Sequence, residues 1–246
     1  MLEATSAAED AHFWFLHLRR TAEAMLREAL AGITPRLIVD CGAGTGRNLD
    51  WLSRFGPAIG VENSWTGLAH ARRNHRRVVP ASVTHLPFAD GAADVTTSFD
   101  VLYCLDDLAE RQAIREMHRV LANDGVALVN AAALDVLRGS HSTFTAERRR
   151  YTRHRLAEKL EDAGFVVERL TYTNMVTLPA MLAARLRDRL AGRAGSASDS
   201  DMRVPAAPIN TAFNSALTVE NALLKMIDLP VGSSVMAVAR KTRRGA

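Results

Sequence analysis

Three glycines and two carboxylic acids in one short stretch have the types and spacing that best suit chemistry in this chain. Gly42, Gly44 and Gly46 follow an apolar run that ends in Asp40. Glycine allows positive φ and carries no Cβ, so such a turn lets a ligand contact the main chain. Glu62 ends the next apolar run, where a carboxylate can accept hydrogen bonds from both hydroxyls of a ribose. The alternative is an ordinary strand–helix turn, which needs fewer glycines and acids.

The glycine spacing argues against a nicotinamide site. A dinucleotide fingerprint, G-x-G-x-x-G, requires its third glycine five positions after the first. Counted from Gly42 that position holds Arg47, and counted from Gly44 it holds Leu49. The pattern is therefore D-x-G-x-G-x-G, which fails the nicotinamide test.

This pattern resembles the first motif of the class I S-adenosylmethionine-dependent methyltransferases. S-adenosylmethionine has no phosphate, but its amino-acid end carries an ammonium group and a carboxylate. The resemblance implies that Asp40 holds the ammonium directly or through water, that glycine-loop amides take the carboxylate, and that Glu62 accepts the ribose hydroxyls. The cofactor-binding residues expected in this region are Asp40, Cys41, Gly42, Gly44, Gly46, Glu62 and Asn63.

Residues 81–94, ASVTHLPFADGAAD, resemble the motif ADAxxLPFxDGxFD of methyltransferases related to ubiquinone and menaquinone biosynthesis enzymes. In that family an aspartate accepts a hydrogen bond from the adenine amino group. This chain has Ser82 there, which is shorter and uncharged but still an acceptor, and Val83 would offer its backbone amide. The run Leu86–Phe88 would wall the adenine pocket, although Phe88 suits a packed loop under the sheet edge equally well.

Residues 94–107, DVTTSFDVLYCLDD, resemble the fourth strand of the family and its following loop, where relatives often have DVLEHL. Tyr103 and Cys104 replace the usual Glu-His pair, so the role of that histidine has no counterpart here. By the same resemblance, Ser98 and Phe99 would border the methionine part of the cofactor.

The N-terminal stretch HFWFLHLRR resembles the HxWFxxRR segment of a bacterial subgroup of these enzymes. We expect residues 1–35 to form a helical lid in which Trp14 and Phe15 exclude water and Arg19 or Arg20 approaches an anionic group. The alternative is an amphipathic helix that packs on the sheet edge with solvated arginines.

The subgroup often carries downstream H-D and R-R-Y patterns, and this chain has His141 followed by Ser142, then Arg150 and Tyr151. The implied reaction is an in-line displacement at the sulfonium methyl, in which alignment contributes about 7–11 kcal/mol in favourable cases. A general base adds roughly 10²–10⁴-fold. His141, with an unperturbed pKa of about 6.5, is the candidate base, and a surface histidine is the alternative. Candidate acceptor contacts are Trp14, Arg20, Tyr103, Arg150 and Tyr151.

Apolar runs alternate with helical spacing along most of the chain. The expected strands are residues 37–41, 58–61, 78–81, 95–99, 126–130, 165–173 and 234–240. Helices are expected before residue 36, between the early strands and at 155–163. This alternation is typical of a doubly wound α/β sheet. The resemblance implies a Rossmann-like sheet of seven strands, mostly parallel, with the last one antiparallel.

The chain is expected to be a single methyltransferase domain, 1–246, whose core spans 36–174. A helical insertion at 175–230 precedes the last strand and basic tail at 231–246, and a flexible Gly/Ser/Asp/Pro-rich loop at 191–208 splits it. The apolar and arginine side chains of its first helix fit a lipid-linked or membrane-surface acceptor. They fit equally a helix packed on the domain, and its second helix suits the core or a homodimer contact.

Composition excludes several other classes of protein. The chain has 246 residues, 48% of them hydrophobic, and a net charge of +4 from 31 basic and 27 acidic residues, which is too mild to indicate a nucleic-acid partner. Two cysteines give no disulfide framework and no metal-ligand pattern. Neither a signal peptide nor an apolar run of about 18 residues is evident, so we expect a cytoplasmic protein.

The acceptor stays open at this stage. A small molecule, a sugar and a lipid-linked compound all fit an S-adenosylmethionine-dependent methyltransferase. Two other classes of function also fit the residues: a non-catalytic S-adenosylmethionine-binding or regulatory protein, and another Rossmann-like nucleotide-dependent enzyme.

Overall fold

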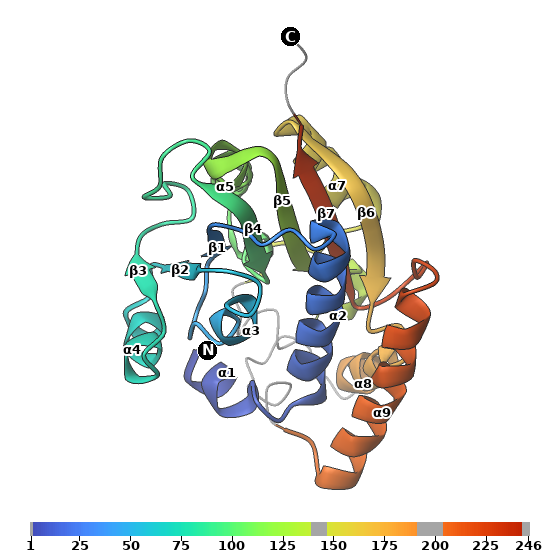
Figure 1. Cartoon of the computed structure of the whole chain (residues 1–246). Helices are drawn as coiled ribbons and strands as arrows, with labels where there is room; N and C mark the ends of the chain where they lie inside the picture. The colour runs from blue at the N-terminus through green and yellow to red at the C-terminus, as the bar shows by residue number, and fades with distance from the viewer. Residues whose placement is uncertain (1, 139–146, 191–203, 243–246) are drawn as a thin grey trace.

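Seven strands form one sheet in the order β3-β2-β1-β4-β5-β7-β6 in the computed structural model, which describes residues 2–138, 147–190 and 204–242 (Figure 1). The strands are β1 (Ile38–Cys41), β2 (Ala58–Glu62), β3 (Val78–Pro80), β4 (Ala93–Phe99), β5 (Leu121–Ala132), β6 (Phe165–Thr173) and β7 (Ser234–Lys241). Strand β7 runs antiparallel to both of its neighbours, and the other six strands are parallel. The predicted Rossmann-like sheet with an antiparallel last strand is confirmed.

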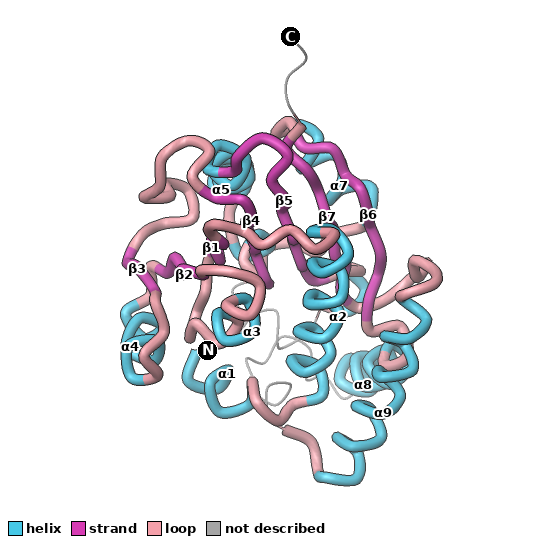
Figure 2. The backbone as a smooth tube through the Cα atoms, in the orientation of Figure 1, coloured by secondary structure: helices cyan, strands magenta, loops and turns pink. Residues whose placement is uncertain are grey.

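Helices lie between most of the strands, two more precede β1, and two form an insertion between β6 and β7 (Figure 2). They are α1 (Leu2–Ala8), α2 (Phe13–Leu30), α3 (Leu49–Leu52), α4 (Trp65–Arg73), α5 (Asp107–Val120), α7 (Arg153–Asp162), α8 (Leu178–Leu190) and α9 (Ala207–Leu224), with short 3₁₀ turns η1 (Leu102–Cys104) and η2 (Asp135–Leu137). In the part of the chain that the structure describes, no helix has both the length and the apolar character that a membrane span needs.

The two faces of the sheet bury separate apolar clusters, as the alternation along strand β5 shows. Ala127, Val129 and Ala131 pack in the cluster that contains α5 and α7, whereas Val126 and Leu128 pack in the cluster that contains α2 and α3. Successive strand residues point to opposite faces, so an unbroken apolar run is what a strand covered on both faces requires.

Local sequence sets several helix ends close to their predicted places. Helix α7 begins two residues before the predicted helix, since the Thr152 side chain accepts a hydrogen bond from the Arg155 amide. Helix α9 includes Pro208, which lies in its first turn, where proline costs no hydrogen bond. The predicted loop 191–208 therefore ends before Ala207; its residues 191–203 lie outside the described part of the chain.

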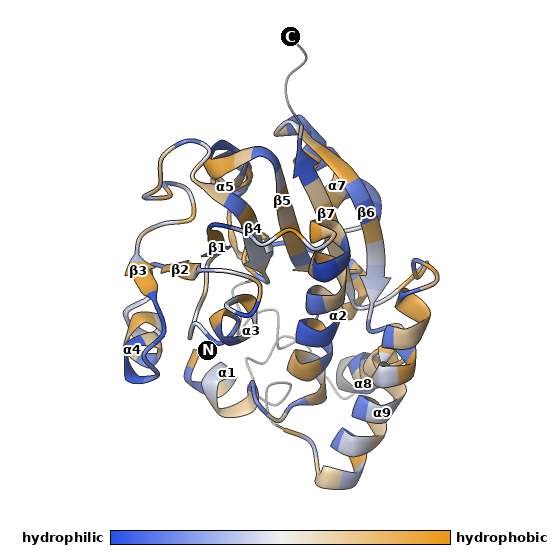
Figure 3. Ribbon diagram, viewed as in Figure 1, coloured by the Kyte–Doolittle hydropathy of each residue, from blue (hydrophilic) through white to orange (hydrophobic). Residues whose placement is uncertain are grey.

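Helices α2 and α9 pack side by side, and both carry mixed hydrophilic and hydrophobic bands (Figure 3). One carboxylate at this contact holds three segments together. Glu220, on α9, accepts hydrogen bonds from His17 Nε2 on α2 at 3.1 Å and from the amides of Asn174 and Val176 at 2.6 and 2.9 Å. Both side chains of the His17–Glu220 pair are fully buried. The C-terminal insertion is thus joined to the N-terminal helix through charge-assisted hydrogen bonds.

Substituting Glu220 by glutamine should lower the free energy of unfolding at pH 7 by about 1.5–3 kcal/mol, because it removes the charge that strengthens the hydrogen bonds to this buried side chain. Burial raises the pKa of Glu220, but the hydrogen bonds from His17 and the two amides outweigh it and leave the pKa below the ordinary value of 4.5. A lowered pKa stabilises the folded state above pH 4.5, and this contribution is lost as the pH falls through the folded-state value. Urea unfolding at several pH values measures both effects.

The matched control is Glu158→Gln, since the Glu158 side chain on α7 is 60% exposed beside His154. It should change the free energy of unfolding by no more than about 0.5 kcal/mol. Equal losses in the two variants, or a loss in Glu220→Gln that does not shrink in acid, would contradict the role given to the buried carboxylate.

Candidate active site

The strand order reverses between β1 and β4, so their carboxyl ends open a crevice at the edge of the sheet. In doubly wound folds, ligands bind in this crevice. The glycine loop follows β1, and Asp100 follows β4. Gly42 and Asp100 are 58 positions apart in the chain, but they follow neighbouring strands, because β1 and β4 pair in register, Ile38 with Val95 and Asp40 with Thr97.

The glycine loop approaches its surroundings too closely for a larger residue at its first position. Gly42 has φ +82°, and a Cβ there would lie 2.4 Å from Cγ2 of Val101, in the turn after β4. The amides of Gly42 and Ala43 both donate to the Val61 carbonyl at 2.9 Å. The predicted need for glycine thus has two causes at Gly42, the backbone angle and the approach of a second loop.

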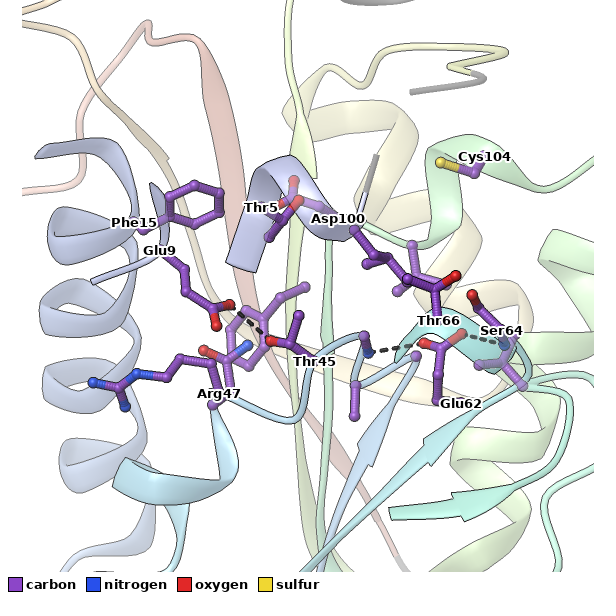
Figure 4. A pocket seen from close by; sticks show the side chains of 18 of the residues that line it. Thr5, Glu9, Phe15, Thr45, Arg47, Glu62, Ser64, Thr66, Asp100 and Cys104 are labelled. Carbon is purple, nitrogen blue, oxygen red and sulfur yellow. Dashed lines mark hydrogen bonds between the residues drawn. The ribbon is translucent and has the colours of Figure 1, made fainter. Parts of the chain in front are cut away.

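The Glu62 carboxylate ties the glycine loop to the end of β2. Its Oε2 accepts a hydrogen bond from the Gly44 amide at 2.8 Å, and its Oε1 accepts from the amides of Asn63 and Ser64 at 3.0 and 2.7 Å. Figure 4 shows Glu62 between the loop and Ser64. These bonds fix the carboxylate in one orientation at the wall of a cavity, and Oε2 keeps a second lone pair for a ligand hydroxyl.

A cavity of about 820 Å³ opens over the glycine loop, which is within the size range of small-molecule sites. Its walls come from α1, the start of α2, the glycine loop, the end of β2 and the turn after β4. Among the predicted cofactor residues, those that line it are Gly42, Gly44, Glu62, Asn63, Val83 and Phe99. Those that do not line it are Asp40, Cys41, Gly46, Ser82 and Ser98.

Asp40 is buried beneath the cavity instead of facing it. Its Oδ1 accepts a hydrogen bond from the Thr97 hydroxyl at 2.7 Å, and Oδ2 has no protein partner among the described residues. Burial raises the pKa of Asp40 to about 7, partly opposed by the Thr97 hydrogen bond. Direct contact with a cofactor ammonium, one of the two predicted options, therefore has no support from the cavity lining.

The predicted adenine wall also differs in detail. Ala81 and Val83 line the cavity, but the run Leu86–Phe88 does not. The Leu86 amide donates to Glu116 on α5 at 2.7 Å. Phe88 packs against the apolar core, which agrees with the alternative prediction of a packed loop. The Ser82 hydroxyl lies 2.8 Å from the hydroxyl of Thr84.

The N-terminal segment covers the glycine loop through a buried hydrogen bond. The Thr45 hydroxyl, in the loop, donates to Glu9 Oε2 at 2.7 Å (Figure 4). Arg47 pairs with Asp10 at 2.6 Å. Burial raises the pKa of Glu9, opposed by the Thr45 hydrogen bond and the charge of Arg76. The sequence held no signal for Glu9, since its partner lies 36 positions away.

Helix α2 lines the cavity with its first turns and packs on the sheet with its later ones, and its action as a lid stays a prediction. Trp14, Phe15, Leu18 and Arg19 line the cavity, while the later residues of the helix pack on the sheet. Arg20 lines neither cavity. Its guanidinium donates to Asn214 and Thr218 of α9 at 2.9 and 3.3 Å, on the exposed side of the helix pair.

A second cavity, of about 400 Å³, adjoins the first. It lies under α8 and α9 and is lined mainly by aromatic, small apolar and paired charged side chains. The two cavities share four lining residues, Trp14, Phe15, Asp100 and Tyr103. The chain therefore builds two connected sites that meet where β4 ends.

Three of the five predicted acceptor contacts line the second cavity, namely Trp14, Tyr103 and Arg150. Tyr151 does not, because it is fully buried and its hydroxyl donates to Glu110 on α5. The predicted base, His141, lies outside the described residues and stays a prediction.

Asp100 was missed by the sequence analysis, although a signal existed. It stands directly after a predicted strand, at the edge where parallel strands present ligands. It has φ +61°, uncommon for a residue other than glycine, and its amide donates to the Asn130 carbonyl at 3.0 Å. Burial raises the pKa of Asp100 to about 7, opposed by a hydrogen bond from Asn130 Nδ2 and the charge of Arg150.

Replacing Gly42 by alanine should reduce stability and ligand binding together, because both the backbone angle and Val101 oppose a Cβ. Gly32 supplies the control: its φ is +86°, but a Cβ there would have nothing within 4 Å. Gly32→Ala should cost only the strain of a left-handed residue, about 1–3 kcal/mol. Gly42→Ala should cost more in thermal or urea unfolding, and Val101→Ala should recover part of the difference. Equal costs would refute the close approach.

Replacing Thr45 by valine should loosen α1 over the glycine loop, because the buried Glu9 carboxyl loses its hydroxyl donor, a loss worth about 1–3 kcal/mol. Amide hydrogen exchange in α1 should accelerate while exchange in α5 stays unchanged. Thr152→Val, which removes the cap of α7 on the other face of the sheet, is the control and should leave α1 protected. Unchanged protection of α1 in Thr45→Val would show that this hydrogen bond does not hold the segment.

Comparison with known proteins gives the same assignment as the glycine motif. Residues 39–129 match the family model described as a methyltransferase domain. A malonyl-[acyl-carrier protein] O-methyltransferase of Coxiella burnetii is 30% identical over 145 residues, which are 58% of this chain and 49% of that protein. Its counterpart in Geobacter sulfurreducens is 33% identical over 173 residues, 60% of this chain and 62% of that protein. The chain thus spans about half to three fifths of the length of these curated relatives.

The fold is shared with solved methyltransferases. The crystal structure of the 1,6-didemethyltoxoflavin-N1-methyltransferase of Burkholderia thailandensis, with bound 1,6-didemethyltoxoflavin and S-adenosylhomocysteine, aligns with a TM-score of 0.55. The alignment covers 92% of this chain and 78% of the Burkholderia chain, with 18% sequence identity. The N-terminal subgroup segment stays a prediction. The match of residues 39–129 to a methyltransferase domain supports the resemblance of the glycine motif to the class I S-adenosylmethionine-dependent methyltransferases.

Proposed function

We propose that this protein transfers the methyl group of S-adenosylmethionine to an acceptor that enters the second cavity. The observation that carries the proposal is the junction of the two cavities after β4, where both share Trp14, Phe15, Asp100 and Tyr103. A donor over the glycine loop and an acceptor under α8 and α9 would meet at this junction. Holding two reactants in line is the main task of such an enzyme, since the positive sulfur already activates the methyl group.

The charges around the first cavity suit a donor with net positive charge. Four carboxyl groups line it, those of Glu3, Glu9, Glu62 and Asp100, against the two guanidinium groups of Arg19 and Arg47. The aromatic rings of Trp14, Phe15, Phe99 and Tyr103 are also part of its walls. A sulfonium group is favoured by carboxylates and by aromatic faces.

Two carboxylates support distinct contacts to the donor. Glu62, held by three amides, keeps an acceptor site for the ribose hydroxyls. Asp40 lies one layer deeper, and its unpartnered Oδ2 suits a water-mediated contact to the donor ammonium, the second of the two options that the sequence offered.

The second cavity suits the reactive end of a modest-sized acceptor. The names of the relatives give one acceptor attached to acyl-carrier protein and one bound small molecule. The cavity, at about 400 Å³, is large enough for the reactive part of either kind. We therefore propose a small-molecule or carrier-linked acceptor for this chain.

Isothermal titration calorimetry with S-adenosylmethionine, S-adenosylhomocysteine and NAD tests the proposal. The first two should bind and NAD should not, because the loop lacks the dinucleotide spacing. Glu62→Gln should weaken both S-adenosyl ligands by about 10–100-fold, as expected for a lost charge-assisted hydrogen bond.

Glu161→Gln, at the end of α7, is the control and should bind like the wild type. Binding of NAD in preference to the S-adenosyl compounds, or no binding of either S-adenosyl ligand to folded wild-type protein, would reject the methyltransferase assignment. Binding without release of S-adenosylhomocysteine across a broad panel of acceptors would favour the non-catalytic alternative.

A further inference from the structure

Asp100 holds a position that no other carboxyl group in the described part of the chain shares, because it lines both cavities. It follows the last residue of β4, and η1 begins two residues later. Its place at the junction means that a group on the acceptor and the transferable methyl of the donor would both come close to this side chain.

The backbone at Asp100 is strained, and a specific partner holds it. The residue has φ +61°. Asn130 on β5 binds it twice: its carbonyl accepts from the Asp100 amide at 3.0 Å, and its Nδ2 donates to Oδ1 at 3.1 Å. Strain that a buried neighbour maintains is frequent where a side chain must be aimed at a ligand.

The other titratable groups around Asp100 are unsuited to accept a proton. Burial raises the pKa of Tyr103 well above its ordinary value and that of Cys104 to about 12, so both are protonated at neutral pH. Glu147 is engaged, since it accepts from Arg150 at 2.7 and 2.9 Å. His12 also lines the second cavity, and its Nδ1 accepts a hydrogen bond from the Trp14 amide at 3.1 Å.

One part of the second cavity suits an apolar body, beside a polar part that includes Glu147, Arg150 and Arg185. Phe13 of α2 and Phe213 of α9 have ring centroids 4.9 Å apart, and both line the cavity with Met181 of α8. The guanidinium of Arg150 is already occupied by Glu147, so it offers little to a second anion. A carboxylate acceptor would therefore be repelled by the Asp100 carboxylate, and the Arg150–Glu147 pair would not offset this repulsion.

We propose, on the basis of the proposed methyl transfer, that Asp100 accepts the proton from a hydroxyl or amine acceptor with an apolar body. The lone pair of the acceptor oxygen or nitrogen forms the bond to the methyl carbon. The carbon–sulfur bond breaks and leaves its electron pair on sulfur, which gives S-adenosylhomocysteine. The proton of the O–H or N–H group moves to the Asp100 carboxylate and later to solvent. An acceptor that is already an anion has no use for this residue.

The test uses sinefungin, an S-adenosylmethionine analogue with an amine in place of the sulfonium methyl, and S-adenosylhomocysteine, which has no group there. Both are titrated by calorimetry into wild type and Asp100→Asn. Asparagine tolerates the left-handed backbone as aspartate does, so the variant should fold. Asp100→Asn should lower the affinity for sinefungin by about tenfold or more, which is the loss expected when a charge-assisted hydrogen bond is removed. Its affinity for S-adenosylhomocysteine should change by less than about threefold.

Glu158→Gln is the control, because Glu158 on α7 is 60% exposed and lines neither cavity. It should leave both affinities as in the wild type. If Asp100→Asn weakens both ligands equally, or weakens neither, the proposal is overturned. Failure of wild type to bind S-adenosylhomocysteine would instead reject the proposed function, so the two failures are distinguishable.

Transfer of labelled methyl groups to a panel of phenols, alcohols, amines and carboxylates gives a second readout. Wild type should methylate a hydroxyl or amine acceptor, and Asp100→Asn should lower kcat by about 10²-fold or more with little change in KM. A preference for carboxylate acceptors, or an unchanged kcat in Asp100→Asn, would overturn the proposal. If no panel member reacts, the affinity ratio decides.

Discussion

The site depends on the bonds between the Glu62 carboxylate and three backbone amides. A glycine-rich loop has little to define its shape, since glycine loses more conformational freedom on folding than other residues. Glu62 supplies that definition from the end of β2 by accepting from Gly44, Asn63 and Ser64. These three hydrogen bonds offset the desolvation cost of burying the Glu62 carboxylate. The carboxylate also lies at the cavity wall, where a ligand hydroxyl can donate to it.

The remaining walls come from the two ends of the chain. The N-terminal segment reaches the glycine loop through the Thr45–Glu9 hydrogen bond, and α9 reaches α2 through the buried His17–Glu220 pair. Both contacts lie beside the cavities and hold helices over the same edge of the sheet.

Two acidic residues near the strand ends show how position decides chemistry. Asp40 belongs to β1, and its side chain faces Thr97 on the neighbouring strand, so it is buried beneath the ligand crevice. Asp100 lies just beyond β4, where a left-handed turn held by Asn130 brings it to both cavities. Burial raises the pKa of both to about 7, but only Asp100 has access to the junction.

Sequence alone determined the features that depend on neighbours in the chain. The glycines of the loop and the apolar alternation of the seven strands follow from backbone geometry and side-chain periodicity, which act over a few residues. Tertiary structure decided which acid faces the ligand, that Arg20 binds α9 instead of an anion, and that Phe13 meets Phe213 across a cavity. These outcomes depend on pairings between residues up to 200 positions apart, whose register no local pattern encodes.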